Sequence, residues 1–153
     1  MGVRVLLELK FLMVTNSREL KDAYKVRETV FIGEQQVPKD IEMDEYDDKA
    51  IHFVVYQKEL PIAAARIRPY QNQDIVKVER VAVLKEHRKT GIGKDLMNYI
   101  EHEARKMGYT KFRLHSQRHA ERFYTKLGYI TISVPFYEAS IEHVTMEKEI
   151  EAL

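Results

Sequence analysis

The residues whose types and spacing most directly indicate anion binding form the segment Arg88-Lys89-Thr90-Gly91-Ile92-Gly93. It follows a β-branched run that predicts a strand and precedes a long segment whose apolar spacing predicts a helix. Backbone N–H groups at a helix start have no intrahelical partners, and the helix dipole favours negative charge there. Gly91 and Gly93 allow close approach of a phosphate, and Lys94 adds positive charge. The alternative is a turn that only caps the helix.

A phenol with aromatic and basic neighbours occurs further along the chain. The segment Gln117-Arg118-His119-Ala120-Glu121-Arg122-Phe123-Tyr124-Thr125-Lys126-Leu127-Gly128-Tyr129 has the form Ala-x-x-Phe-Tyr-x-Lys-x-Gly-aromatic. Its spacing predicts a helix over 117–127 that ends at Gly128. Because a phenol with an ordinary pKa of about 10 is protonated at neutral pH, Tyr124 can donate a proton. The alternative is an aromatic side chain that packs in the core.

Carboxylates and histidines provide candidates for a general base and for a metal site. Glu79 lies two residues before Val81 in a predicted strand, which places both side chains on one face. It can accept a proton through a water, or it is an ordinary exposed carboxylate; Glu34 and His115 are weaker candidates. His115 and His119 are four residues apart, but a strand–helix boundary is expected between them and no third ligand is evident. We therefore expect no metal.

An acidic segment at 40–48 is predicted to be a solvated loop, and attraction of a cationic amine is the alternative. Its acids are Asp40, Glu42, Asp44, Glu45, Asp47 and Asp48. Arg27 lies on an otherwise apolar helix face, so we expect it to pair with an acid such as Asp44, with substrate contact as the alternative. His143 is predicted to be a packed, hydrogen-bonded histidine.

The elements that must position these residues follow from hydrophobic periodicity. Strands are predicted at 11–15, 51–56, 61–68, 75–84, 110–115, 129–134 and 143–150. One helix is expected to begin after Asn16, with Glu19 completing a capping box, and another to begin at Ile92. The strand–helix–strand order from residue 75 onward predicts a parallel pair with a right-handed crossover. The remaining strands are expected to be antiparallel, so the fold class is α+β with a mixed sheet.

Composition narrows the class of protein. The chain has 153 residues, with 25 Lys and Arg against 24 Asp and Glu, which predicts one domain without the basic excess of a nucleic-acid binder. The absence of cysteine excludes disulfides, thiolate metal sites and a cysteine nucleophile. No apolar run approaches the ~20 residues of a membrane helix, and the apolar segment 5–14 is interrupted by Glu8 and Lys10. We expect a cytoplasmic protein without a signal peptide.

Together with Val81-Ala82-Val83, the two motifs occur in an order and spacing that resemble the GNAT superfamily of acetyl-CoA-dependent N-acetyltransferases. The flanking residues look like the YjcF/ElaA-type branch of that superfamily. They are Arg27-Glu28-Thr29-Val30-Phe31 with Glu34-Gln35, then Asp44-Glu45, and Phe136 with Ile141-Glu142-His143 and Met146. We expect a single domain, 1–153. The resemblance extends from Phe11 onward, so residues 1–10 fall outside the resemblance.

This resemblance implies a mixed, mostly antiparallel sheet with a central splayed parallel pair, flanked by about four helices. It implies direct attack of a neutral amine on acetyl-CoA, with Tyr124 as the general acid; we add Glu79 as the base. The residues expected to bind acetyl-CoA are Val81, Ala82, Val83, Arg88, Lys89, Thr90, Gly91, Ile92, Gly93, Lys94, Gln117, Phe123 and Lys126. Phe31, Glu34 and Gln35 are expected to line the acceptor site.

Two other functions remain open at this point. A CoA-binding sensor or scaffold would share the fold and the phosphate loop without catalysing transfer. A relative of acyl-homoserine-lactone synthases would share the core, but the glycine-containing loop at 88–93 argues against it. For an N-acetyltransferase the partner is a small amine, or a peptide, with no nucleic acid and no membrane; a homodimer is an expectation by analogy.

Overall fold

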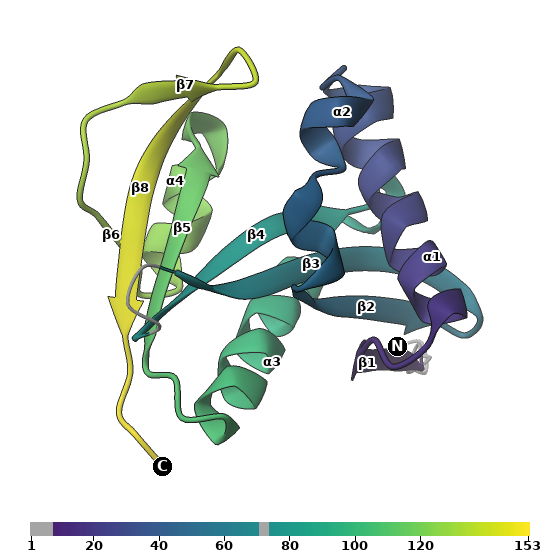
Figure 1. Ribbon diagram of the computed structural model, residues 1–153, viewed down its shortest axis with the longest axis horizontal. Coiled ribbons are helices and arrows are strands. Elements are labelled where there is room, and N and C mark those ends of the chain that lie inside the picture. The colour runs from purple at the N-terminus through teal and green to yellow at the C-terminus, as the bar shows by residue number, and fades with distance from the viewer. Residues whose placement is uncertain (1–7, 71–73) are drawn as a thin grey trace, which may run out of the picture.

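The computed structural model describes residues 8–70 and 74–153, which are arranged around an eight-stranded sheet (Figure 1). The strands are β1 (Leu9–Met13), β2 (Ile51–Gln57), β3 (Leu60–Tyr70), β4 (Ile75–Val83), β5 (Lys111–Gln117), β6 (Ile130–Thr131), β7 (Phe136–Glu138) and β8 (Ile141–Glu149). Their order is β1-β2-β3-β4-β5-β8-β6, with β7 paired to β8. Residues 1–7, most of the segment expected to fall outside the family resemblance, lie outside the described residues.

The sheet is mixed, as predicted. Strands β4 and β5 are parallel, and the other strand pairs are antiparallel. The parallel pairing covers only four residue pairs, from Ile75 opposite Lys111 to Val78 opposite Leu114. Beyond that point β4 and β5 diverge, and Figure 1 shows the two strands separating towards their carboxyl ends. The splayed parallel pair is therefore confirmed.

Helices cover both faces of the sheet (Figure 1). One face carries α1 (Ser17–Arg27), which continues into the π-helical segment η1 (Glu28–Glu34). The short turns α2 (Lys39–Glu42) and η2 (Glu45–Asp48) follow. The opposite face carries α3 (Ile92–Lys106) and α4 (Glu121–Lys126). Asn16 caps α1 as predicted, because its side chain accepts from the Glu19 amide at 2.8 Å, while Glu19 accepts from the Thr15 amide.

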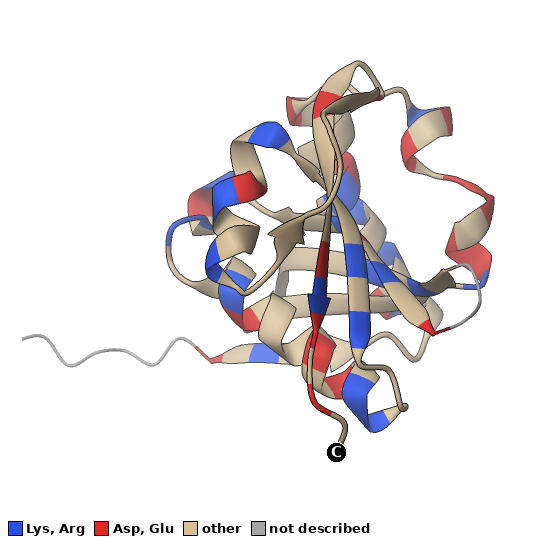
Figure 2. Cartoon of the chain, turned by 90° about the vertical axis from the view of Figure 1, so that its left-hand side faces the viewer, with Lys and Arg blue, Asp and Glu red and all other residues tan. Residues whose placement is uncertain are grey.

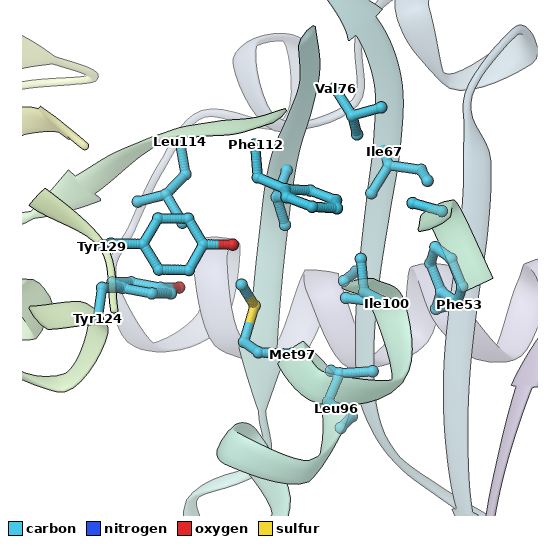
Figure 3. Close-up of a cluster of buried hydrophobic side chains, with 14 of the residues drawn as sticks. Phe53, Ile67, Val76, Leu96, Met97, Ile100, Phe112, Leu114, Tyr124 and Tyr129 are labelled. Atoms are coloured by element: carbon cyan, nitrogen blue, oxygen red, sulfur yellow. The ribbon is translucent and has the colours of Figure 1, made fainter. Parts of the chain in front are cut away.

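Two apolar clusters hold these layers together. The cluster beneath α1 includes Ala23, Val26 and Ala82. The larger cluster lies beneath α3 and α4, and Figure 3 shows Leu96, Met97 and Ile100 of α3 among its residues. The spacing of Ile92, Leu96, Met97, Ile100 and Ala104 places all five on the buried side of α3.

Several predicted boundaries differ from the structure. The strand expected at 129–134 is only Ile130–Thr131, and β7 was not predicted. The helix expected at 117–127 begins later, because β5 continues through Gln117, where it pairs with His143 of β8. A single 3-10 turn, η4 (Arg118–Ala120), then leads into α4. Strand pairing, which local spacing does not encode, determines these ends.

A β-bulge in β4 corrects one prediction about side-chain direction. Arg80 has φ +58°, and the register passes from Ala64 opposite Ala82 to Arg66 opposite Glu79. Two residues of β4 therefore oppose one residue of β3, which shifts the alternation by one position. Val81 packs on the α3 side, whereas Glu79 lies on the α1 side with Arg66. The expectation that Glu79 and Val81 share a face is wrong for this reason.

Charged residues of both signs are interspersed along the helices and strands on the side shown in Figure 2. No helix in the described part of the chain is long and apolar enough to cross a membrane.

Candidate functional site

The divergence of β4 and β5 opens a cavity of about 1050 Å³ between them. Its walls include Val81, Ala82 and Val83 from β4, with Leu114 and His115 from β5. On the side facing β5, the part of β4 beyond Val78 has no strand partner among the described residues. Backbone donors and acceptors on this edge are therefore available to an extended, amide-containing ligand.

The loop between β4 and α3 closes one end of the cavity. Its backbone is left-handed at Lys89, with φ +63°, and at Gly91, with φ +90°. The helical hydrogen bonds of α3 begin at the Asp95 amide, which donates to the Gly91 carbonyl. No described residue accepts from the amides of Ile92, Gly93 or Lys94, so the helix start presents free N–H groups to an anion.

Close packing at Gly93 explains the second glycine of the motif. A Cβ atom built there would lie 3.2 Å from the Phe123 ring and 3.9 Å from a Val83 methyl group. Gly93, Lys89 and Lys94 line the cavity. The loop thus combines free amides, two cations and a backbone that a ligand can approach.

Arg88 connects the loop to η1 rather than extending freely. Its Nη2 forms an ion pair with Glu34 of η1 at 2.8 Å, and its Nε donates to the Val83 carbonyl at 2.9 Å. At the same rim of the cavity, the Gln117 side chain donates a hydrogen bond to the Gln35 side chain at 2.7 Å. Segments more than 50 residues apart in sequence therefore meet at the rim of the cavity.

The structure brings most of the predicted binding residues to the cavity. Those that line it are Phe31, Gln35, Val81, Ala82, Val83, Arg88, Lys89, Gly91, Gly93, Lys94, Gln117 and Phe123. Thr90 instead donates to the His87 carbonyl at 2.6 Å, and the Ile92 side chain is buried in the core. Lys126 is exposed on α4 and is not a lining residue, and Glu34 approaches the cavity only through Arg88.

Tyr124 lies where the cavity meets the core beneath α3 and α4. Its side chain is only 9% exposed, and its ring packs edge-on against Phe123 and Tyr129, at 4.9 and 5.9 Å between centroids. Figure 3 shows the two tyrosines next to each other at the edge of the cluster. Burial raises the pKa of the Tyr124 phenol well above 10. The phenol has no hydrogen-bond partner among the described side chains, and it stays protonated at any physiological pH.

The acids predicted to form a solvated loop are in part buried ion-pair partners, which corrects that expectation. Arg27, fully buried, is paired with Glu42 at 3.0 Å and Asp47 at 2.7 Å. The predicted pairing of Arg27 with an acid is confirmed, although the acids differ from the suggested Asp44. Asp44 instead pairs with Arg66 at 2.6 Å, and also with the arginine of the bulge.

This ion-pair cluster attaches the segment after α1 to the sheet. Burial alone would raise the pKa of the Asp47 carboxyl, but hydrogen bonds and charge from Arg27 and Arg66 lower it below its usual range. The carboxylates are therefore retained in their charged form. The part of the cavity wall formed by α2 and η2 depends on them for its position.

Glu79 belongs to the same network. It lies 3.0 Å from Arg66, 2.7 Å from Arg68 and 3.1 Å from Lys77. Burial opposes the charged form, but the hydrogen bond from Arg68 and the nearby cations lower the pKa of Glu79 to about 2. Glu79 lines the cavity, and its role as the general base stays a prediction. Such a carboxylate accepts a proton only weakly near neutral pH.

The low pKa of Glu79 predicts how stability depends on pH. A carboxylate whose pKa falls from 4.5 to about 2 on folding stabilises the protein fully above pH 4.5, and this contribution is lost as pH falls towards 2. We expect Glu79→Gln to reduce the difference in unfolding free energy between pH 7 and pH 3, measured with urea. Exposed Glu86→Gln is the control and should leave the difference unchanged. An equal difference in Glu79→Gln and wild type would contradict the ion-pair geometry.

His115 of β5 and Glu138 of β7 form a histidine–carboxylate pair that the sequence did not predict. His115 Nδ1 lies 2.9 Å from Glu138 Oε2, and both side chains line the cavity. Glu138 was missed because the three-residue β7 gives no periodic signal. His143 is packed as predicted, stacked on Phe136, with Nδ1 2.7 Å from the Ile141 carbonyl. No group of three metal-ligand side chains occurs within residues 8–70 and 74–153.

Comparison with known proteins was made against family models, curated sequences and solved structures. The model of the acetyltransferase (GNAT) domain matches residues 12–150. The chain belongs to the GNAT acetyltransferase family. This GNAT protein is 40% identical over 142 residues to the Bacillus subtilis protein named uncharacterized N-acetyltransferase YjcF, which covers 92% of this chain and 100% of the relative.

Solved structures agree with this assignment. Escherichia coli ElaA superposes with a TM-score of 0.80 at 23% identity, over 94% of this chain and 100% of that one. A GNAT family acetyltransferase from Elizabethkingia anophelis, solved with acetyl-CoA bound, gives a TM-score of 0.72 at 13% identity, over 93% and 98% of the two chains. At these identities the structures support the fold. The GNAT protein described here is an acyltransferase of the YjcF/ElaA branch.

Proposed function

We propose that this GNAT protein transfers an acetyl group from acetyl-CoA directly to a primary amine of a small molecule or peptide. The observation that carries the proposal is the cavity at the fork of β4 and β5, which joins an amide-rich helix start at one end to a buried phenol and a polar acceptor side. The acyl donor supplies an activated thioester. The residues of the chain must bind that donor, orient the amine and move protons.

The donor is held mainly by backbone in this proposal. The free amides at the start of α3, with Lys89 and Lys94, take the diphosphate. The unpaired edge of β4 at Val81, Ala82 and Val83 bonds the amide-containing arm as an added strand would. A backbone N–H near Val81 stabilises the negative charge that develops on the carbonyl oxygen. Lys126 is the weakest of the proposed donor contacts, because it does not line the cavity.

Tyr124 is proposed to protonate the departing sulfur. Its phenol is kept neutral by burial and lines the cavity on the α4 side, where a donor bound at the helix start would place its thioester end. The chain contains no cysteine, so transfer through a cysteine acyl-enzyme is excluded and a direct route is favoured. The single-domain organisation, the cytoplasmic location and a homodimer stay predictions.

Thiol release tests the function. Wild-type protein with acetyl-CoA is assayed for free CoA against a panel of amino acids, polyamines, aminosugars and peptides with free N-termini. Amine-dependent release, with the acetylated product identified by mass spectrometry, is the expected result. Tight CoA binding by calorimetry without release for any amine would instead identify a CoA-binding sensor or scaffold.

A substitution at Gly93 tests the donor site independently of the acceptor. Gly93→Val should weaken CoA binding at least about tenfold, since a side chain there meets Phe123 and occupies space next to the free amides. Calorimetric titration with CoA measures the effect. Gly108→Ala is the control, because this glycine also has a special backbone, with φ +99°, but lies at the far end of α3. Gly108→Ala should lower the melting temperature and leave CoA affinity unchanged. Equal CoA affinity in Gly93→Val and wild type would contradict the proposed donor site.

A further inference from the structure

The amine that attacks a thioester must first lose a proton, and the cavity contains a group suited to accept it. His115 is the first residue of β5 beyond the part paired with β4, so its side chain lies at the fork where the two strands separate. It lines the cavity, and its Nδ1 is 2.9 Å from Glu138 Oε2. This inference rests on the proposed function and names a residue for its unassigned proton transfer.

The two ring nitrogens of His115 have different surroundings. A carboxylate only accepts hydrogen bonds, so the 2.9 Å contact requires the proton on Nδ1. Nε2 then carries the lone pair, and no described residue donates to it. Glu138 favours this tautomer and would also stabilise the imidazolium formed when Nε2 takes a proton.

The sheet separates this histidine from the proposed acid. Phe112, Leu114 and Ser116 alternate with it along β5, and the two apolar ones pack in the cluster beneath α3 and α4 that also contains Tyr124. His115 therefore points to the opposite, α1-side face. A base on the acceptor side and an acid on the donor side allow one proton to leave the amine and another to reach the sulfur.

The charges around His115 favour it over Glu79. Besides Glu138 of β7, the charged or titratable groups that act on this pair among the described residues include His143 of β8, whose Nε2 lies 4.0 Å from the same carboxylate, and Lys77 of β4. Burial opposes the charged form of Glu138, but the hydrogen bond from His115 and the charge of Lys77 hold its pKa below the usual range. Glu138 is therefore available as a charged partner. Glu79 is also charged, but three cations already pair with it.

We propose that His115, positioned by Glu138, is the general base that deprotonates the acceptor ammonium. One proton passes from the ammonium to Nε2 and is released to solvent as the net proton of the reaction. The neutral nitrogen then bonds to the acetyl carbon while the carbon–sulfur bond breaks. The nitrogen loses its second proton to water, Tyr124 gives its own proton to the sulfur, and the resulting phenolate takes a proton back from water, so that one proton is released in total. His115 is the catalytic residue here, and Glu138 is a positioning residue.

The kinetic test uses the amine of the panel that wild type acetylates fastest. His115→Asn and His115→Gln should lower kcat/KM by about 100-fold and remove its decline at acid pH. Glu138→Ala should also lower kcat/KM, because Nδ1 loses the carboxylate that orients the ring, and Glu138→Asp should restore part of the rate. His102→Asn, an exposed histidine on α3, is the matched control and should behave as wild type. CoA affinity by calorimetry should be unchanged in all variants.

Nitrogen NMR gives a readout that does not depend on turnover. Long-range proton–nitrogen spectra of labelled wild type, assigned with His115→Asn, should show Nδ1 protonated and Nε2 unprotonated at alkaline pH. Glu138→Ala should mix the two tautomers. A His115 protonated on Nε2 in wild type, or His115→Asn turnover within about twofold of wild type, would overturn the assignment.

The two proposals fail in different ways. Wild type that acetylates an amine while His115→Asn does so equally well overturns only the role of His115. Wild type that binds CoA and acetylates no amine of the panel overturns the proposed function, and the catalytic role of His115 with it.

Discussion

Tyr124→Phe should lower kcat by about 100-fold while the dissociation constant for CoA stays the same. The substitution removes one hydroxyl group from a ring that otherwise keeps its packing against Phe123 and Tyr129. Because the hydroxyl has no partner among the described residues, its loss leaves no other polar group unsatisfied. Steady-state kinetics with the fastest amine, and calorimetry with CoA, measure the two quantities.

The matched control is Tyr137→Phe, on a tyrosine that is 73% exposed on β7 and does not line the cavity. It should retain wild-type kcat. If Tyr124→Phe turned over as fast as this control, the phenol would be a packing residue and the sulfur would take its proton from solvent. Unfolding by urea should give similar midpoints for both variants, which separates a catalytic effect from loss of structure.

Arg27→Met should lower the free energy of unfolding by about 3–5 kcal/mol. The arginine is fully buried, and its guanidinium is bonded to Glu42 and Asp47, themselves 1% and 7% exposed. Methionine approximates the stem of the side chain but leaves both carboxylates without their main cation in a site poorly accessible to water. Urea denaturation at neutral pH, followed by far-UV circular dichroism, measures the loss.

Arg18→Met on the exposed side of the same helix is the control and should change stability by less than about 0.5 kcal/mol. A second prediction for Arg27→Met separates an effect on the position of α2 and η2 from an effect on stability. Because α2 and η2 form part of the cavity wall that is proposed to face the acceptor, Arg27→Met should raise KM for the amine more than it changes CoA affinity. A variant as stable as Arg18→Met would show that the buried ion pairs contribute little.

Local signals in the sequence predicted the strand, loop and helix start that form the proposed donor half of the site. The strand before residue 84, the glycines at 91 and 93 and the helix that begins at Ile92 are contiguous, so spacing alone brings them together. The divergence of β4 and β5 followed from the family resemblance and is confirmed by pairing that stops at Val78.

The proposed acceptor half could not be predicted in the same way, because it is assembled from residues far apart in the chain. The partners of Arg27 lie 15 and 20 residues away in a segment without periodicity, and charge alone made that segment look solvated. The pairing of His115 with Glu138 depends on β7, whose three residues give no pattern. The bulge at Arg80 is likewise invisible, since a non-glycine residue with φ +58° carries no sequence marker.

The extra residue at Arg80 divides β4 into two parts whose sequences can change independently. Before it, the strand presents Lys77 and Glu79 to the α1 side; after it, Val81 and Val83 pack on the α3 side. Under the proposed function, substitutions before the bulge should alter the choice of acceptor, and those after it should alter binding of the donor. Deleting one residue would exchange inward and outward side chains over the rest of the strand. This strand should therefore tolerate substitutions far better than insertions or deletions.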